Sequence, residues 1–343
     1  MKEFFLYLQN FMIDPDRIPV AMLAIMLVTV VGMVTGPMHG NANPFLWKVV
    51  NGLFGGVGGR LDRTQRRASD LMFRGFILLV LGLVFFYLIG EAGGKLAREY
   101  PFKGLTEIVL LSLSMTGGTV WFVLLRFYFA QRDNKISPGA FSSIARSTRT
   151  NLVGVDGFGL TRTGMAFAAR AFDKGLVAPV FWYLLLGLPG AYIYACLAGF
   201  AWRFGKDGFT KGFGTIPLGL ERLLGWIPGM FAGVLMALAG LFTPTGGMTR
   251  ALKVLGRKGK GMAPYDQGGW PVTAIAFSLN VSLGGPVTDL DGSSLKRDWV
   301  GPDHATAQLE NGHLRRAIYL TLMAHMLFLA SLLGALFWGN LLF

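Results

Sequence analysis

The sequence predicts an all-α, polytopic integral membrane protein with about six transmembrane helices, some of them kinked or broken. Of the 343 residues, 52% are hydrophobic and 15% are charged, whereas an ordinary soluble domain has about 25% charged residues. Apolar stretches also recur along the whole chain, and a helix needs about 20 such residues to cross the hydrocarbon core of a bilayer. We therefore expect a single membrane domain over residues 1–343, with the lipid bilayer as its first partner.

Six apolar stretches form the predicted spans, and a short segment precedes them. The stretches fill residues 18–36, 75–90, 105–130, 175–202, 223–243 and 317–338. We expect residues 1–17 to form an interfacial N-terminal segment, because residues 4–12 are mostly apolar and Asp14-Pro15 ends this run.

Two spans carry signals for an irregular helix. In the third stretch, residues 112–119 are mostly small and polar. Such a run predicts either close helix packing, which is the simpler interpretation, or a broken helix that lines a cavity. In the fourth stretch, Leu188-Pro189-Gly190 predicts a kink or a division, because proline cannot donate a helix hydrogen bond. In the last stretch, we expect His325 to be neutral and bonded to a neighbouring helix.

The basic residues predict the orientation of the chain. The net charge is +13. The loops after the first, third and fifth spans hold 22 Lys and Arg residues, whereas the other two loops hold 7. Basic loops stay in the cytoplasm, so we expect the larger loops 131–174 and 244–316 to be cytoplasmic and both termini to face outward. Basic loops also suit anionic headgroups, and we expect no nucleic-acid partner.

Common catalytic and metal-binding motifs are missing from the sequence. The chain has no phosphate loop, no H-E-x-x-H pair and no serine elbow, and its four histidines share no metal-ligand spacing. The single cysteine, Cys196, excludes a disulfide framework. No metal ligand and no cofactor is therefore predicted from the residues alone.

A series of backbone-shaping motifs in residues 36–320 carries a family resemblance. The motifs are Ala178-Pro179, Gly187-Leu188-Pro189-Gly190, Gly269-Trp270-Pro271, Gly284-Gly285-Pro286 and Trp299-Val300-Gly301. In this order they resemble the CobD/CbiB membrane family of cobalamin biosynthesis, the adenosylcobinamide-phosphate synthases. The chain is also similar to AmpE-like inner-membrane proteins. The resemblance implies a multi-pass protein of the bacterial cytoplasmic (inner) membrane.

The resemblance also implies a reaction and shows where this chain departs from it. The family joins adenosylcobyric acid and aminopropanol phosphate in an ATP-dependent amide formation, which plausibly needs carboxylates to hold magnesium. The family's Glu-Asn and Asp before the Ala-Pro motif are here Arg170-Ala171 and Lys174. Further departures are Asn43 for a His, Ala166 for a Glu, Ala198–Ala201 for Asn-Thr-Leu-Asp, Glu221-Arg222 for a paired Asp, Gly225 and Met230 for Asn and Arg, Tyr265 for an Asn and Val272 for a Glu. Since Ala, Lys and Arg cannot replace a metal-binding carboxylate, most of the family's site is lost.

A few residues remain able to do chemistry. Asp156 and Arg162 keep family residue types and are the catalytic candidates, because Gly154-Val155-Asp156 resembles the family's Gly-Arg-Asp motif. The ligand-binding candidates lie around the Gly-Gly-Pro and Trp-x-Gly motifs: Gly284, Gly285, Asp289, Asp291, Trp299 and Asp303. Asp289 and Asp291 could bind a cation, but a capped turn with Gly292 is the commoner use of such a pair.

Three hypotheses follow. The main one is a divergent CobD/CbiB-like protein with a non-catalytic binding, sensory or accessory role, with a corrinoid as a candidate ligand. The alternative is an adenosylcobinamide-phosphate synthase, which alone would need Mg²⁺ and ATP and predicts that Asp156, Asp289 and Asp291 converge. The third is a structural subunit of a membrane complex with a membrane-protein partner.

Overall fold

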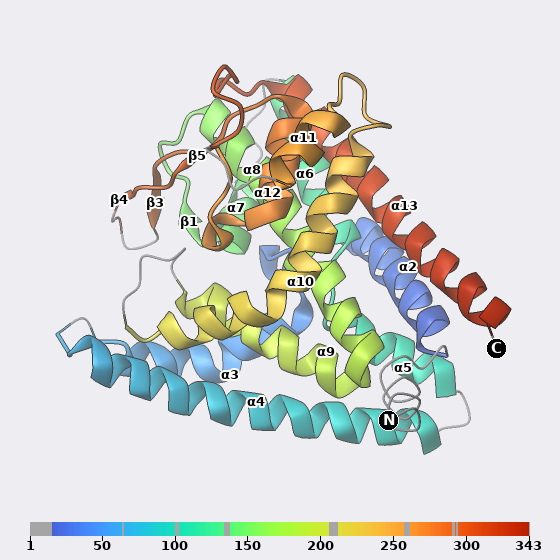
Figure 1. Ribbon diagram of the computed structural model, residues 1–343. Helices are drawn as coiled ribbons and strands as arrows, with labels where there is room; N and C mark the ends of the chain where they lie inside the picture. The colour runs from blue at the N-terminus through green and yellow to red at the C-terminus, as the bar shows by residue number, and fades with distance from the viewer. Residues whose placement is uncertain are drawn as a thin grey trace.

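The computed structural model describes residues 16–63, 65–99, 103–133, 138–205, 212–256, 261–289, 292 and 294–342, and it is dominated by helices (Figure 1). The predicted interfacial segment lies almost wholly outside these residues. The helices are α2 (Arg17–Thr35), η1 (Met38–Gly40), α3 (Phe45–Leu61), α4 (Ala68–Glu99), α5 (Lys103–Ser112), α6 (Gly118–Arg132), α7 (Pro138–Thr148), α8 (Gly157–Phe172), η2 (Asp173–Val177), α9 (Ala178–Phe204), α10 (Thr215–Ala239), α11 (Met248–Leu255), η3 (Tyr265–Gln267), α12 (Gly269–Leu279) and α13 (Asn311–Leu342).

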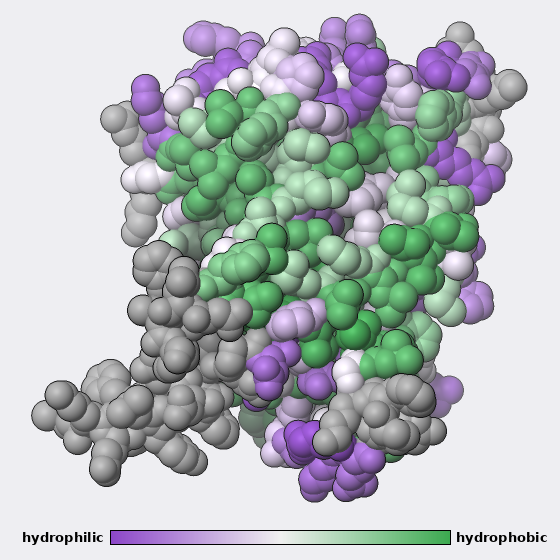
Figure 2. All heavy atoms as spheres, turned by 90° about the vertical axis from the view of Figure 1, so that its right-hand side faces the viewer, coloured by the Kyte–Doolittle hydropathy of each residue, from purple (hydrophilic) through white to green (hydrophobic). Residues whose placement is uncertain are grey.

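The long helices confirm a multi-pass membrane protein of the all-α class. Among the described residues, five helical segments are long and apolar enough to cross a membrane: α2, α4, the continuous run Gly157–Phe204, α10 and α13. Large apolar side chains are exposed along α2, α4 and α13, for example Val34, Leu81 and Phe337. Figure 2 shows such side chains as a broad hydrophobic band between two hydrophilic ends. This surface suits lipid.

The third predicted span is a broken helix, and its break is also a site of close packing. α5 ends at Ser112 and α6 begins at Gly118. A Cβ atom added to Gly118 would lie 1.9 Å from the main-chain oxygen of Thr29, so glycine is needed where α6 meets α2. Both interpretations of residues 112–119 therefore hold, because the small residues pack closely and the helix is also interrupted.

The fourth predicted span is two helical legs rather than one crossing. Gly187 has φ 68° and ψ −159°, and α9 turns back there. The second leg runs antiparallel to α4, because Gly90 of α4 lies against Pro189 and Gly82 lies against Phe200. In Figure 1, the two legs diverge from this turn and α4 lies along the second one.

This turn corrects the orientation that the basic residues predict for the fourth loop. Gly75 at the start of α4 lies against Phe213, and Gly58 of α3 lies against Phe204. The described parts of the fourth loop, residues 203–205 and 212–222, therefore lie beside the first loop, not on the opposite side of the molecule. The prediction was wrong at this point because it counted residues 175–202 as a single crossing.

The two larger predicted loops are mostly ordered secondary structure. α7 and α8 fill most of residues 131–174, and α8 continues through η2 into α9. Residues 244–316 contain α11, α12 and four of five short strands, which a purely helical fold class does not include. The strands are β1 (Thr150–Asn151), β2 (Leu283–Gly284), β3 (Val287–Asp289), β4 (Ser294–Leu295) and β5 (Trp299–Val300). β3 pairs antiparallel with β1 and β4, and β2 pairs antiparallel with β5.

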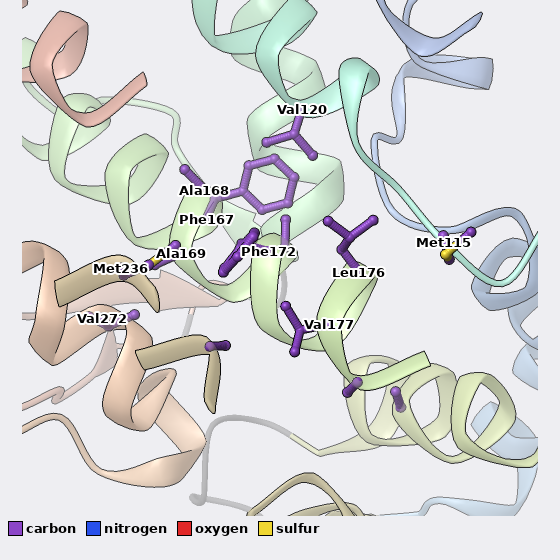
Figure 3. Close-up of a cluster of buried hydrophobic side chains, with 14 of the residues drawn as sticks. Met115, Val120, Phe167, Ala168, Ala169, Phe172, Leu176, Val177, Met236 and Val272 are labelled. Carbon is purple, nitrogen blue, oxygen red and sulfur yellow. The ribbon is translucent and has the colours of Figure 1, made fainter. Parts of the chain in front are cut away.

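The run from α8 to α9 forms the centre of the hydrophobic core. Figure 3 shows Phe167 and Phe172 of α8 and Leu176 and Val177 of η2 among buried side chains of the surrounding elements. This packing fixes the polar residues that interrupt the run.

His325 of α13 also packs here, on the ring of Phe172. Its Nδ1 atom lies 2.8 Å from the main-chain oxygen of Thr321, so its partner is in its own helix and not in a neighbouring one.

Candidate functional site

A cavity of about 100 Å³ lies between the end of α8 with η2 and the end of the second leg of α9. Arg170 and Lys174, from the end of α8 and from η2, line one wall, and Ala198 and Ala201 of the second leg of α9 line the other. The start of α3, the break before α6, the turn after α7 and the first turns of α10 complete it. The turn at Gly187 is what brings these distant parts of one predicted span around the same space.

Cationic side chains dominate the cavity lining. Arg149, Arg170, Lys174 and Arg203 contribute positive charge, and the acidic side chains are Glu221 and Asp266. Asp266 is paired with Arg222 at 2.5 Å, so its charge is compensated. The lining as a whole therefore favours a negatively charged ligand.

Arg149 is held in an unusual backbone conformation at the edge of this cavity. It directly follows α7 and has φ 55°, in the left-handed region that costs a non-glycine residue about 1–2 kcal/mol. Its guanidinium donates to the main-chain oxygen of Arg203 and lies 5.7 Å from the ring centre of Trp202. These contacts with α9 position the arginine, and such strain clusters at functional sites.

A buried ion pair joins the two sides of the cavity. Lys174 Nζ donates to Glu221 Oε2 at 2.9 Å, and the Glu221 side chain is fully buried while that of Lys174 is 14% exposed. Tyr194 and Tyr265 donate to the other carboxylate oxygen at 3.1 and 2.9 Å. Burial and the charge of Glu221 raise the pKa of Tyr265 well above its usual range, so its hydroxyl stays protonated and remains a donor.

The local backbone explains why Lys174 faces the cavity. Residues Asp173–Val177 form a π-helical turn, a feature that often lies at functional sites because it rotates the side chains that follow. The main-chain oxygen of Gly175 accepts a hydrogen bond from the amide of Thr116 at 2.7 Å. A Cβ atom on Gly175 would lie 2.5 Å from Thr116 Cγ2, so only glycine permits this contact. The break between α5 and α6 therefore contacts the π-helical turn and helps to hold it in place.

Two buried donors in the lining have no hydrogen-bond partner among the described residues. They are the indole Nε1 of Trp47, whose residue is 6% exposed, and Nε of Arg203. Both residues line the cavity. Buried donors are normally satisfied by protein or by ordered water or ligand, so two residues of the lining each hold a donor that the described residues leave unsatisfied.

The residues of this cavity do not fit the magnesium ion that the parent reaction implies. Mg²⁺ needs free carboxylate oxygens near phosphate. Here both oxygens of Glu221 already accept hydrogen bonds, one of them from an ammonium group, and Asp266 pairs with Arg222. Within the described part of the chain, no group of three or more His, Cys, Asp and Glu residues could hold a metal ion.

The catalytic candidates from the sequence lie outside the cavity lining. Asp156 is the N-cap of α8 and accepts a hydrogen bond from the amide of Gly159 at 2.7 Å. Arg162 donates to the main-chain oxygen of Ala307 at 2.7 Å and lies 5.4 Å from the ring centre of Trp299. In this structure Asp156 caps α8, and Arg162 links α8 to the strand region around Trp299.

The ligand-binding candidates gather in the strand region instead. Gly284 and Gly285 have φ 87° and 79°, and β2 pairs Gly284 with Trp299. Asp303 is exposed in a turn, the backbone of Asp289 pairs with Thr150, and Asp291 lies outside the described residues. Asp156 and Asp303 do not line the cavity.

The cavity lining includes residues that the sequence analysis treated as departures from the family pattern and did not name as candidates. Eight positions in or beside those departures line the same cavity: Asn43, Pro44, Arg170, Ala171, Lys174, Ala198, Ala201 and Glu221. A ninth, Tyr265, bonds to Glu221. These residues were visible in the sequence as departures from the family pattern. The sequence analysis interpreted them as the loss of a site and not as the lining of a cavity.

Comparison with known proteins identifies the family of the chain. The model of the CobD/Cbib protein family matches residues 29–321. This chain belongs to the CobD/CbiB family. The Cobalamin biosynthesis protein CobD of Brucella anthropi is 26% identical over 312 residues, which cover 85% of this chain and 93% of the relative.

Other relatives carry the same name. The Cobalamin biosynthesis protein CobD of Sinorhizobium fredii is 25% identical over 279 residues, covering 77% of this chain and 83% of the relative. That of Rhodobacter capsulatus is 29% identical over 204 residues, covering 58% and 62%. No solved structure matches the chain.

Proposed function

We propose that this CobD/CbiB family member is a binding protein of the bacterial cytoplasmic membrane that does not form the amide bond of the parent reaction. Its ligand enters the cavity between the end of α8 with η2 and the second leg of α9. A sensory or accessory role in cobalamin metabolism follows from such binding, and a corrinoid is the candidate ligand.

One observation carries the proposal. Several of the positions interpreted as departures from the family pattern, among them Arg170, Lys174 and Ala198, come together around one cavity, where cationic or apolar side chains stand. Arg170 and Lys174 occupy the places of a family Glu and Asp, and the remaining carboxylate, Glu221, is bonded to Lys174. A magnesium-dependent step would require the Glu221 carboxylate to bind the metal in place of the Lys174 ammonium. The metal and the carboxylate would both have to be desolvated, which is costly.

The size of the cavity limits what can enter it. The cavity offers about 100 Å³ to groups of the size of a water molecule, which is several times the volume of about 10–15 Å³ that one buried water needs. A phosphate or carboxylate group fits this space, whereas a corrin ring does not. A corrinoid would therefore place only an acidic substituent inside, with its ring at the opening.

The parent activity is the second candidate function. It is favoured by relatives that are named cobalamin biosynthesis proteins. In that case Mg²⁺ and ATP would be required. A structural role in a membrane complex, with a membrane-protein partner, is a third candidate, and a stoichiometric partner retained in mild detergent would support it.

Binding and turnover should be measured on the same detergent-purified protein. Corrinoid binding is followed by absorbance and ATP binding by calorimetry, and amide formation is assayed with Mg²⁺, ATP, adenosylcobyric acid and aminopropanol phosphate. Arg203→Met tests the cavity, Arg162→Ala tests the catalytic candidate from the sequence, and Lys95→Met on an exposed part of α4 is the control.

The proposal predicts binding that weakens in Arg203→Met and persists in Arg162→Ala and Lys95→Met, without product. Product formation that depends on Mg²⁺ and ATP would contradict it and support the second candidate. Loss of binding in Arg162→Ala alone would move the site to the strand region.

A further inference from the structure

The ammonium group of Lys174 occupies a bridging position in the cavity. It is held by Glu221 Oε2 at 2.9 Å on one side and lies 4.5 Å from the ring centre of Tyr265. An ammonium group has three hydrogen-bond donors. One donor is used on Glu221, so the others remain available for an acceptor, and the residue also lines the cavity.

The groups around the same space are also donors. The Nε1 atom of Trp47 and the Nε atom of Arg203 are buried without a partner among the described residues. Trp47 is more than nine-tenths buried, so its N–H cannot be satisfied by bulk water. Two residues that line the same space thus each carry a buried N–H without a partner among the described residues, and Lys174 adds a fixed ammonium charge.

We propose that Lys174 takes the place of a divalent cation in this cavity and bridges Glu221 to a phosphate-bearing ligand, so that binding needs no metal. This inference rests on the proposed binding function. In a magnesium site, the metal joins one or two protein carboxylates to the phosphate oxygens. The pair of Lys174 and Glu221 has the same arrangement of charges, with the ammonium in the position of the metal.

Physical chemistry supports this substitution. Lysine is a point charge that binds phosphate directly, without the fixed fork geometry of arginine. The contacts of Glu221 with Tyr194 and Tyr265 hold the carboxylate in place and so hold the ammonium. A divalent cation, in contrast, would meet the charges of Lys174, Arg170 and Arg203 in the same lining. The site thus carries its own cation and disfavours another.

The test uses inorganic phosphate and pyrophosphate as probes. Their binding to the full-length protein in detergent is measured by calorimetry, once with Mg²⁺ and once with EDTA. We expect the same affinity under both conditions. Lys174→Met should weaken binding at least about tenfold, as expected for the loss of a buried charge contact, and Trp47→Phe should weaken it about fivefold, as for one lost hydrogen bond. Lys95→Met is the matched control.

Two further variants keep the test decisive if Lys174→Met does not fold. Glu221→Gln retains an acceptor for Lys174 and should still bind phosphate without metal. The double variant Lys174→Met, Glu221→Gln removes both charges together and should lose binding while remaining folded.

The inference is overturned by binding that requires Mg²⁺, by a double variant that binds as well as the parent protein, or by no phosphate binding at all. None of these outcomes decides whether the proposed binding function is correct. That function fails if amide product forms, and it survives if a corrinoid binds although free phosphate does not.

Discussion

Removing the ammonium group of Lys174 should strongly destabilise the protein, because its partner cannot reach water. The Glu221 side chain is 0% exposed and would keep only its two tyrosine donors. Breaking a buried ion pair by removing one partner costs about 3–5 kcal/mol, so we expect a loss of this size for Lys174→Met. Replacing both charges, as in Lys174→Met with Glu221→Gln, is often close to neutral. The double variant should therefore be more stable than the single one.

Unfolding in mixed micelles with increasing SDS measures this difference, and the eight tryptophans provide the fluorescence signal. Lys95→Met removes an exposed lysine of α4 and should change stability by less than about 0.5 kcal/mol. If the double variant loses as much stability as Lys174→Met, then the cost is not that of an unpaired buried carboxylate. The reasoning about the ion pair would then be wrong.

Two glycines give further predictions. A Cβ atom on Gly225 would lie 2.0 Å from the hydroxyl of Tyr265, so Gly225→Ala should displace this donor from the carboxylate, weaken ligand binding and cost about 1–3 kcal/mol in SDS unfolding. Gly219→Ala, on the same helix with open space around it, should leave both unchanged or raise stability by up to about 1 kcal/mol. Gly118→Ala should cost at least about 1–3 kcal/mol by thermal denaturation, since its Cβ would meet the Thr29 main chain. Equal stability of the Gly118 and Gly219 variants would contradict this packing.

Much of the fold could be predicted from the sequence, because length and apolarity decide whether a helix can cross a bilayer. The apolar stretches coincide with α2, α4, α9, α10 and α13. The turn at Gly187 could not be predicted as a reversal, since Pro189 is compatible with either a kink or a division. Only packing of the second leg on α4 selects the reversal, and that contact links residues far apart in the sequence.

The site was harder to predict because the residue types that resemble those of the family lie outside the cavity lining. Asp156 and Arg162 were chosen because they keep family types, but one caps α8 and the other braces it against Trp299. The positions interpreted as departures were more informative, because residues there line one cavity and determine its charge. Lys174 and Glu221 are 47 residues apart in the sequence, and only the fold shows that the lysine charge meets a carboxylate.

The account depends most directly on whether the purified protein forms the amide. Adenosylcobyric acid, aminopropanol phosphate, ATP and Mg²⁺ should be incubated with this chain and, in parallel, with the Brucella anthropi relative, with corrinoid binding measured in the same samples. The account predicts that this chain binds its ligand and yields no amide. Amide formation by this chain that stops when Mg²⁺ is chelated would contradict the account.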